Sequence, residues 1–424
     1  MTGTAGSRPV IAVAVHDGFY GCGTGAGYCN HALLDILPGL TRPAVRLVAM
    51  PIRLTPASSE YDHQWHQQAA ASLDRAGAEV IPVANSTGGR TRFGGLANFR
   101  AACGAAAEII TGLNPPQGRT LVIASDAPFY GLAPLLHRDI RPGLVSIAHA
   151  TALLHAPGDS ARISWERAGL RETARSGGHI AAISRYMHDH LTAAYRIPST
   201  AIVELPSGLT RGEQHPATSP AGALLPPPAR GRFLLAFGRA EPYKGFDDLL
   251  DALAILRAGH DDIPHTIIGA VTDGPPPTAY QQHLAHRIAA EQHEATLITR
   301  FTPGLRVLLG HPALAAIIIP SRAEPAGRIP LDAFAAGASP IVATTAGGLA
   351  ELVTEGETGF TAQPSSPRSL AAAIHRALAA SQAQRAQMRS AGRRHLATRY
   401  DYQTSVRSFL NVVAPWAIAG TQSI

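Results

Sequence analysis

Short runs of apolar and β-branched residues alternate with Ala- and Leu-rich segments along the whole chain of 424 residues. This alternation is typical of βαβ units, in which helices cover both faces of a parallel sheet. Eleven segments are expected to be strands, which is many for a single open sheet. These segments are residues 9–15, 46–50, 79–83, 120–125, 144–148, 179–183, 233–237, 265–268, 295–299, 315–319 and 339–343.

A Pro-rich segment, residues 213–231, interrupts this series after the sixth strand and contains three consecutive prolines. Such a composition is typical of a linker between domains. We therefore expect one α/β domain over residues 1–212 and a second over residues 232–398. The tail, residues 399–424, carries apolar residues suited to a helix, and we expect this helix to pack back on the first domain.

The overall composition indicates a folded protein. Hydrophobic residues make up 46% of the chain and charged residues 16%, and the formal net charge is +6. The basic residues are scattered and form no block with interleaved aromatics, so we expect no nucleic-acid partner. A mild excess of Arg fits phosphate-bearing ligands.

The cysteines and the apolar segments indicate a cytoplasmic protein. The three cysteines have no metal-ligand spacing, and their odd number suits a reducing compartment. No apolar stretch reaches the roughly 18 residues of a membrane span, and no signal peptide is expected. We expect neither a bound metal nor a cofactor.

Lysine occurs once in the chain, at Lys244, whereas every other Lys or Arg position is arginine. Lysine carries a compact ammonium and arginine a planar fork, so we expect Lys244 to lie where the fork does not fit. Arg239 precedes it, at the end of an expected strand. Two cations at a strand end suit a diphosphate. The alternatives are a solvated surface lysine and salt bridges to Glu241 or Asp247.

A second pattern follows the expected strand at 315–319. A loop carries Glu324, a helix is expected to begin near Arg328 with Pro330 in its first turn, and Asp332 lies about one turn into that helix. Carboxylates bind sugar hydroxyls well because each accepts strong hydrogen bonds. The alternative is a helix cap and a surface acid. A further strand, glycine turn and helix start follow at residues 343–351.

A glycine-rich loop, Gly21–Gly27, separates the first strand from a helix expected to open near Tyr28. Glycines let a backbone approach a phosphate, and a helix N-terminus favours an anion. The loop also fits the G-x-G-x-x-A form of a dinucleotide site, although it is longer than that tight turn. An ordinary flexible loop is the third interpretation, and the loop alone does not decide between them.

In this order and spacing, the motifs resemble those of the retaining GT-B glycosyltransferases related to glycogen synthase and sucrose-phosphate synthase. The resemblance covers nearly all of residues 232–365, whereas the first domain resembles the family only in layout. The matching positions are Arg239, Lys244, Gly245, Glu324, Asp332, Ala333, Ala335, Gly337, Gly347, Gly348, Glu351, Leu352 and Val353.

The resemblance implies two doubly wound, Rossmann-like domains facing across a cleft, and it assigns roles by position. Asp332 stands where the family usually has Glu, and Arg328 stands where it has an apolar residue, so Arg328 is expected to add a phosphate contact or to alter donor choice. The resemblance implies that Arg239 and Lys244 contact the donor diphosphate and that Asp332 contacts the ribose. It implies that Glu324 and the N–H groups of Ala326 and Gly327 contact the transferred sugar, and that Gly23 approaches the phosphate and the sugar. His149, with His155 as a competitor, would lie near the transferred sugar.

The implied reaction is transfer of a sugar, with retention, from a nucleoside diphosphate sugar to a hydroxyl, and we favour a UDP-sugar. No Asp-x-Asp pair occurs in the sequence, so we expect the basic residues to take the place of a metal. Asp17, Asp126 and Tyr130 follow strands of the first domain and would bind a small polar acceptor such as an aminocyclitol. Some actinobacterial antibiotic-pathway glycosyltransferases look similar in this region. Helix capping is the alternative for both acids.

Three other functions fit parts of the sequence. A nucleotide-sugar epimerase can share the fold, and a non-catalytic protein could bind the sugar nucleotide without turnover. A pyridoxal-phosphate enzyme could use Lys244 in a Schiff base. The glycosyltransferase hypothesis leads because it accounts for the order and the spacing of the motifs together.

Overall fold

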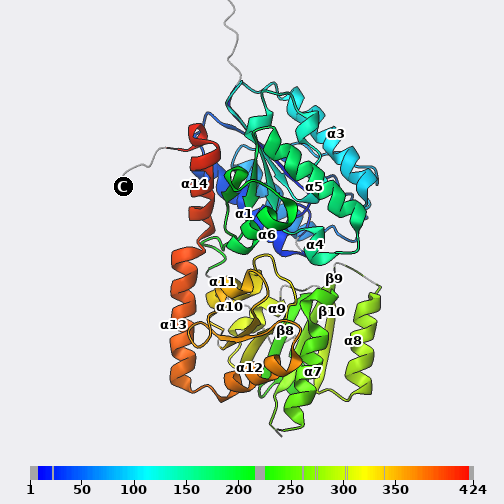
Figure 1. Ribbon diagram of the computed structural model, residues 1–424, viewed down its shortest axis with the longest axis vertical. Coiled ribbons are helices and arrows are strands. Elements are labelled where there is room, and N and C mark those ends of the chain that lie inside the picture. The colour runs from blue at the N-terminus through cyan, green and yellow to red at the C-terminus, as the bar shows by residue number, and fades with distance from the viewer. Residues whose placement is uncertain are drawn as a thin grey trace, which may run out of the picture. The chain divides into compact units, whose positions relative to one another are not determined.

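The computed structural model describes residues 8–21, 23–214, 225–259, 262–272, 274, 276–300, 302, 304–338 and 340–419. The chain forms two compact units, one of Met1–Ser207 with Tyr402–Ile424 and one of Gly208–Asp401 (Figure 1). The second unit starts earlier than the expected linker because Leu209 is fully buried in its core. Residues 215–224 of that linker lie outside the described residues.

The first unit is built on a seven-stranded parallel sheet in the order β3-β2-β1-β4-β5-β6-β7. β1 lies between β2 and β4, and its Val10 pairs with Arg46 of β2 and with Thr120 of β4. The strands are β1 (Val10–Val15), β2 (Arg46–Pro51), β3 (Glu79–Val80), β4 (Thr120–Ser125), β5 (Leu144–Ala148), β6 (His179–Ala182) and β7 (Ile202–Glu204).

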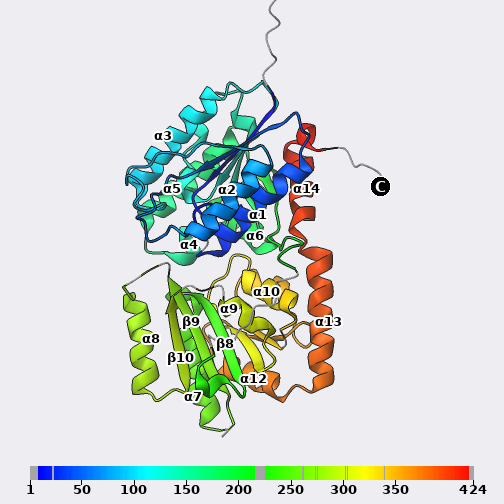
Figure 2. The ribbon, with the colours of Figure 1, turned by 180° about the vertical axis from the view of Figure 1, so that it is seen from behind.

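Helices cover both faces of this sheet, as its apolar strands require. Figures 1 and 2 show α3 and α5 on one face and α1 and α2 on the other. The C-terminal helix α14 packs on α1 and β7, which confirms the expectation for the tail. The helices of this unit are α1 (Gly25–Leu40), α2 (His63–Arg75), α3 (Leu96–Gly112), α4 (Ala152–His155), α5 (Ser160–Arg175), α6 (Arg185–Tyr195) and α14 (Tyr402–Val413).

The second unit is built on a six-stranded parallel sheet in the order β10-β9-β8-β11-β12-β13. Phe233 of β8 pairs with His265 of β9 on one side and with Leu314 of β11 on the other. The strands are β8 (Phe233–Arg239), β9 (His265–Thr272), β10 (Ala295–Arg300), β11 (Leu314–Ile319), β12 (Ile341–Thr344) and β13 (Phe360–Ala362).

Two apolar layers, one on each face, hold this second sheet. One layer packs Leu249, Leu253 and Ile374 of α7 and α12 against the sheet, and the other packs Leu331 and Phe334 of α10. The helices are α7 (Phe246–Arg257), α8 (Ala279–Ala290), α9 (Gly304–Val307), α10 (Arg328–Ala336), α11 (Leu349–Leu352), α12 (Pro367–Ala379) and α13 (Gln382–Arg399). Short 3₁₀ helices of the chain span Ala127–Phe129, Ala133–Leu135, Arg141–Gly143, Ser199–Ala201, Pro227–Ala229, Pro242–Lys244, Leu308–Gly310 and Pro415–Ala417.

The eleven expected strands all coincide with strands of the structure, whereas β7 and β13 were not expected. Each of these two edge strands has only three residues, too few to show a strand pattern in the sequence. The strand expected at 79–83 is shortened to β3 because Pro82 cannot donate to a ladder. Residue 339 of the last expected strand lies outside the described residues.

Each sheet has one point at which the direction of strand addition reverses. In the first unit this point lies between β1 and β4, and in the second it lies between β8 and β11. In open α/β sheets, ligands bind beyond the carboxyl ends of the strands at such a point. The loops after these four strands are therefore the places to look for a site. In the described part of the chain, no helix is long and apolar enough to cross a membrane.

Candidate functional site

Lys244 and Glu324 meet at the strand-order reversal of the second unit. Lys244 ends the 3₁₀ turn after β8, and Glu324 lies in the loop between β11 and α10. The Nζ atom of Lys244 lies 2.5 Å from Oε2 of Glu324, and each side chain is 14% exposed. The hydroxyl of Ser321 donates to the same carboxylate oxygen over 3.2 Å. The two motifs singled out in the sequence thus form one ion pair.

Burial of the Lys244 ammonium would by itself lower its pKa, but the carboxylate of Glu324 outweighs this effect and raises the pKa above the ordinary value. The ammonium also lies 5.5 Å from the ring centroid of Tyr243, within the range of a cation–π contact. Lys244 is therefore a fixed, partly buried cation, which excludes the solvated surface lysine considered above.

Arg239 is the last residue of β8, and its side chain is 49% exposed. Its guanidinium lies 3.4 Å from Oε1 of Glu241. This is one of the salt bridges considered as an alternative role for Arg239. Exposed pairs of this kind are weak, typically about 0–1 kcal/mol, so an anionic ligand can compete for the arginine.

Asp332, on α10, is held by two arginines. Both Arg306 and Arg328 contact its Oδ1 atom, Arg328 at 3.2 Å. Arg328 also donates to Glu213 over 2.5 Å, and its side chain is only 10% exposed. Burial works to raise the pKa of Glu213, but Arg328 lowers it below the ordinary value. In the described contacts, the guanidinium of Arg328 thus binds two carboxylates of its own unit.

The loop of Glu324 is joined to the glycine turn that follows β12. The backbone N–H of Gly348 donates to the carbonyl of Glu324 over 2.9 Å. Gly327, one residue before α10, has a φ of +103°, and Ala326 precedes it. The backbone between Glu324 and α10 is therefore shaped by two of the motifs found in the sequence.

Asp17 follows β1 in the first unit and is almost fully buried. It accepts hydrogen bonds from the hydroxyl of Thr24 and the N–H of Gly18, and Arg92 lies 3.1 Å from Oδ1. A Cβ atom at Gly27 would lie 2.8 Å from that same Oδ1 atom. The Asp17 carboxylate therefore packs so closely against the first turn of α1 that it leaves room only for a glycine at position 27.

The glycine loop ends earlier than expected, because α1 begins at Gly25 rather than near Tyr28. Thr24 caps the helix by accepting from the N–H of Gly27 over 2.9 Å. Gly23 directly precedes this cap. The expected contact of Gly23 with phosphate and sugar therefore stays a prediction, placed at a helix N-terminus.

His149 follows β5 and is buried, and its Nε2 atom lies 3.1 Å from Oδ1 of Asn30. Asn30 also accepts from Ser125 over 2.8 Å and donates to the carbonyl of Asp17 over 3.2 Å. Burial, helped by the nearby His16, lowers the pKa of His149 to about 3, so its imidazole is neutral. His155 ends α4, whereas His149 is the histidine that reaches Asn30.

Asp126 follows β4 and has a φ of +66°, which is uncommon outside glycine. One carboxylate oxygen accepts from the backbone N–H of His149 over 3.0 Å. Burial raises the pKa of Asp126 to about 7, although Arg162 acts to lower it. Asp126 thus has an internal role, which is to fix the backbone turn that carries His149.

Tyr130 corrects one expectation from the sequence. It has no exposed surface, and its hydroxyl donates to the carbonyl of Ile147 over 3.3 Å. Since a fully buried side chain cannot touch an acceptor, the acceptor contact predicted for Tyr130 is wrong. Tyr130 belongs instead to the core beside β5.

Several residues of these clusters were not identified from the sequence. They are single polar residues to which the sequence patterns assigned no role, and most of their partners are distant in the chain. Only Asp248 gave a usable signal, since acids in the first turn of a helix often interact locally. The residues are Thr24, Asn30, Arg92, Glu213, Asp248, Arg306 and Arg322.

Comparison with known proteins shows a family to which part of this chain is similar. Residues 225–395 match the family described as glycosyl transferases group 1. The glycogen synthase of Mycobacterium tuberculosis is 31% identical over 272 residues, which cover 62% of this chain and 60% of that protein. The D-inositol 3-phosphate glycosyltransferase of Geodermatophilus obscurus is 29% identical over 282 residues, 65% of this chain and 60% of that protein. The matches thus span 60% of the length of these relatives.

Solved structures show a likeness of fold that extends beyond residues 225–395. Anabaena Alr3699/HepE in complex with UDP-glucose superimposes with a TM-score of 0.69 at 18% identity, covering 96% of this chain and 99% of that one. The sucrose-phosphate synthase of Thermosynechococcus elongatus gives 0.71 at 17% identity with the same coverage. These similarities confirm the expected fold of two parallel-sheet α/β domains of the GT-B type.

Proposed function

We propose that this chain transfers a sugar, with retention, from a nucleoside diphosphate sugar to a hydroxyl of a small polar acceptor. The observation that carries the proposal is the Lys244–Glu324 ion pair at the strand-order reversal of the unit that resembles the group 1 glycosyltransferases. It sets a cation for the diphosphate beside a carboxylate for the hydroxyls of the sugar.

The chemistry requires stabilisation of a leaving group. As the bond between sugar and phosphate breaks, the diphosphate gains negative charge, and groups that bind this charge most strongly at the transition state lower the barrier. We assign this role to Lys244 and Arg239, with the N-terminus of α10 as a further electropositive group. The acceptor would attack from the face of the leaving group, so no protein nucleophile and no metal ion are assigned.

Asp332 is assigned to the ribose of the nucleotide. Its carboxylate is oriented by Arg306 and Arg328, both on Oδ1. Since a carboxylate offers about four lone-pair sites, these two contacts leave capacity for hydroxyl donors. Arg328 then acts by holding Asp332, in place of the phosphate contact expected from the sequence. We favour a UDP-sugar, in line with the UDP-glucose complex of the similar Anabaena structure.

The acceptor is proposed to be a cyclitol or a similar polyol, bound by the first unit. The name of one group of relatives, D-inositol 3-phosphate glycosyltransferase, states a cyclitol phosphate as substrate. Asp17 already faces Arg92, and Asp126 accepts from the backbone of His149. Because both acids have internal partners, we expect the acceptor to be recognised through its hydroxyls. The amino groups of an aminocyclitol would be secondary.

The three competing functions differ from the proposal either in the charge they need on Lys244 or in what happens to the donor. A Schiff base needs a neutral amine, whereas Glu324 raises the pKa of Lys244, so this geometry does not favour a pyridoxal-phosphate enzyme. An epimerase would consume the donor without any acceptor. A binding protein would hold the donor and release no nucleoside diphosphate.

Two measurements test the proposal. A thermal-shift panel of UDP-, GDP-, dTDP- and ADP-sugars should show stabilisation of the protein by one nucleotide class, and binding to none of them would end the proposal. With that donor, nucleoside diphosphate should be released only when a polyol acceptor such as myo-inositol is present. Lys244→Ala should lower the rate of this release by about 10²–10³-fold, and Arg287→Gln, on helix α8, should serve as the control.

A further inference from the structure

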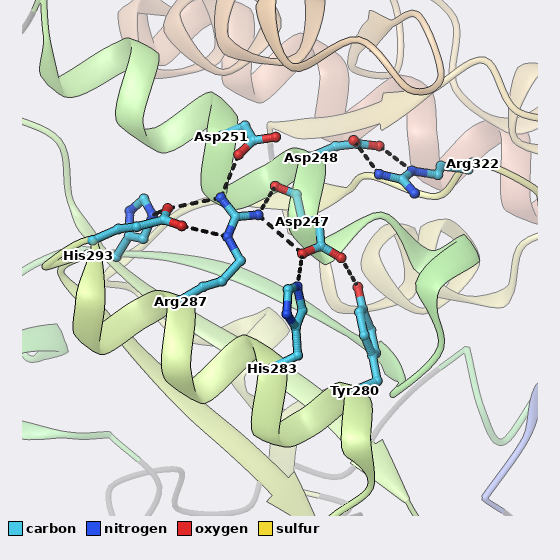
Figure 3. A network of polar contacts seen from close by, with 9 residues as sticks. Asp247, Asp248, Asp251, Tyr280, His283, Arg287, His293 and Arg322 are labelled. Atoms are coloured by element: carbon cyan, nitrogen blue, oxygen red, sulfur yellow. Dashed lines mark hydrogen bonds and ion pairs between the residues drawn. The ribbon is translucent and has the colours of Figure 1, made fainter.

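Helix α7 begins at Phe246, directly after Lys244 and Gly245. Its first turn carries two adjacent acids, Asp247 and Asp248. Figure 3 shows that their side chains reach different partners. Asp248 binds Arg322 through two hydrogen bonds, from Nε over 2.7 Å and from a terminal nitrogen over 2.6 Å. Such a paired fork is both strong and geometrically specific.

Asp247 instead binds the neighbouring helix α8. It accepts from the hydroxyl of Tyr280 over 2.7 Å, and its other oxygen lies 2.8 Å from Nε2 of His283 and 3.1 Å from the guanidinium of Arg287. Arg287 in turn binds Asp251. Asp247 therefore joins two helices on one face of the sheet (Figure 3). In the described contacts it forms no hydrogen bond or ion pair with the Glu324 loop, although its charge acts on Arg322.

The loops of Lys244 and Glu324 touch at two further points besides their own ion pair. The backbone N–H of Arg322 donates to the carbonyl of Tyr243 over 2.7 Å. Gly245 has a φ of +72°, and a Cβ atom there would lie 1.9 Å from the carbonyl oxygen of Pro320. Only glycine permits this approach. The side chain of Arg322 then ties the same loop to the start of α7.

We propose that Asp248 and Arg322 are positioning residues that hold the Glu324 loop against the Lys244 turn and so fix the distance between Lys244 and Glu324. Arg322 is two residues from Glu324, and Asp248 is four residues from Lys244. The ion pair between Asp248 and Arg322 therefore joins the two segments close to Lys244 and Glu324. The consequence for catalysis rests on the proposed function, whereas the structural consequence for Lys244 does not.

The single lysine gives a direct readout. Selective ¹³Cε-lysine labelling yields one lysine resonance, whose pH titration reports the pKa of Lys244. In Asp248→Asn and in Arg322→Gln we expect this pKa to fall, because Lys244 stays buried while Glu324 is less well held. The matched controls Asp247→Asn and Arg287→Gln should leave it unchanged.

The variant Arg322→Gln distinguishes a loss of positioning from the direct electrostatic effect of removing a charge near Lys244. Removing a nearby cation would by itself raise the pKa of Lys244, whereas loss of positioning lowers it. A pKa that rises or stays constant in Arg322→Gln would therefore overturn the proposal. If a single variant does not fold, the double variant Asp248→Asn/Arg322→Gln, which leaves no unpaired charge, carries the same test.

Activity provides the second readout. With the donor identified for the wild-type protein, Asp248→Asn and Arg322→Gln should lower kcat by about 10²-fold, the usual order of effect for a displacement of about 1 Å. The controls should lower the unfolding temperature to a similar extent and keep kcat. Equal kcat in test and control variants would contradict the positioning role. If the wild-type protein turns over no sugar nucleotide, the proposed function fails, and the Lys244 titration still decides this inference.

Discussion

The ammonium of Lys244 and the carboxylate of Glu324 lie 2.5 Å apart although 80 residues separate them in the sequence. They meet because β8 and β11 are neighbours in a parallel sheet, so the loops that follow these strands leave the same edge. Only 14% of each side chain is exposed, which makes the pair sensitive to the loss of either partner. The first two predictions follow from this relationship.

Replacing Lys244 should reduce transfer more than it reduces donor binding. Lys244→Ala removes a cation assigned to the leaving group, and loss of one such group typically costs about 10²–10³-fold in kcat. Lys244→Arg should fall between the wild-type protein and Lys244→Ala, because the charge remains but the fork does not fit the compact site. Steady-state release of nucleoside diphosphate measures both effects. Unchanged kcat in Lys244→Arg would show that the lysine is not at the diphosphate.

Replacing Glu324 should change the titration of Lys244. Burial lowers the pKa of the ammonium and Glu324 raises it, so Glu324→Gln leaves burial unopposed by that carboxylate and the pKa should fall. The raised pKa in the wild-type protein keeps Lys244 charged over the whole neutral range, so its titration should not limit activity there. A Lys244 pKa that is the same in Glu324→Gln would show that the two groups are apart in solution.

His149 should show no titration in the neutral range. Burial lowers its pKa to about 3, so the imidazole is neutral above about pH 5 and can act only as a hydrogen-bonding group. The pH profile of kcat should therefore lack a limb near pH 6.5, the ordinary pKa of histidine. His149→Asn should lower kcat without altering the shape of the profile. A limb near neutral pH that disappears in His149→Asn would contradict this description.

Asp126 should make the protein less stable as the pH rises. Burial raises its pKa to about 7, whereas the unfolded chain releases this proton near pH 4. Between these values the folded state holds a proton that the unfolded state has lost, so the contribution of Asp126 to the free energy of unfolding falls with increasing pH.

Urea unfolding of the wild-type protein and Asp126→Asn at about pH 5 and about pH 8 tests this sign, because the linear extrapolation gives the free energy of unfolding at each pH. The variant should gain stability relative to the wild-type protein as the pH is raised. The comparison removes the opposite contribution of His16, whose pKa burial lowers to about 4. The same pH dependence in both proteins would rule out a titrating Asp126.

The sequence predicted the strands because these depend on local patterns, and it placed Lys244 and Glu324 in segments that follow strands. Apolar runs mark strands, and the ends of neighbouring parallel strands converge at one edge of a sheet. The order of strands within each unit, which brings these two residues together, was not predicted, since periodicity does not reveal it. β13 was missed because three residues carry too little pattern.

Contacts between single side chains of distant segments were not predictable. Asp248 and Arg322 are 74 residues apart, and no spacing rule joins them. Tyr130 was misassigned for a related reason, because an aromatic residue after a strand can point to a ligand or into the core, and here it is fully buried. Asp332 follows the family's position, but its two arginine partners come from the tertiary fold.

The most direct test of the central claim is a titration of the ¹³Cε-lysine-labelled protein with nucleoside diphosphates and their sugars. We predict that the chemical shift of the single Lys244 resonance changes saturably with one nucleotide class, with the same Kd that calorimetry gives. Nucleotides of the other classes should leave this chemical shift unchanged. If calorimetry detects binding of a sugar nucleotide while the Lys244 resonance does not move, the diphosphate is bound elsewhere, and the assignment of Lys244 and Glu324 to the donor site is contradicted.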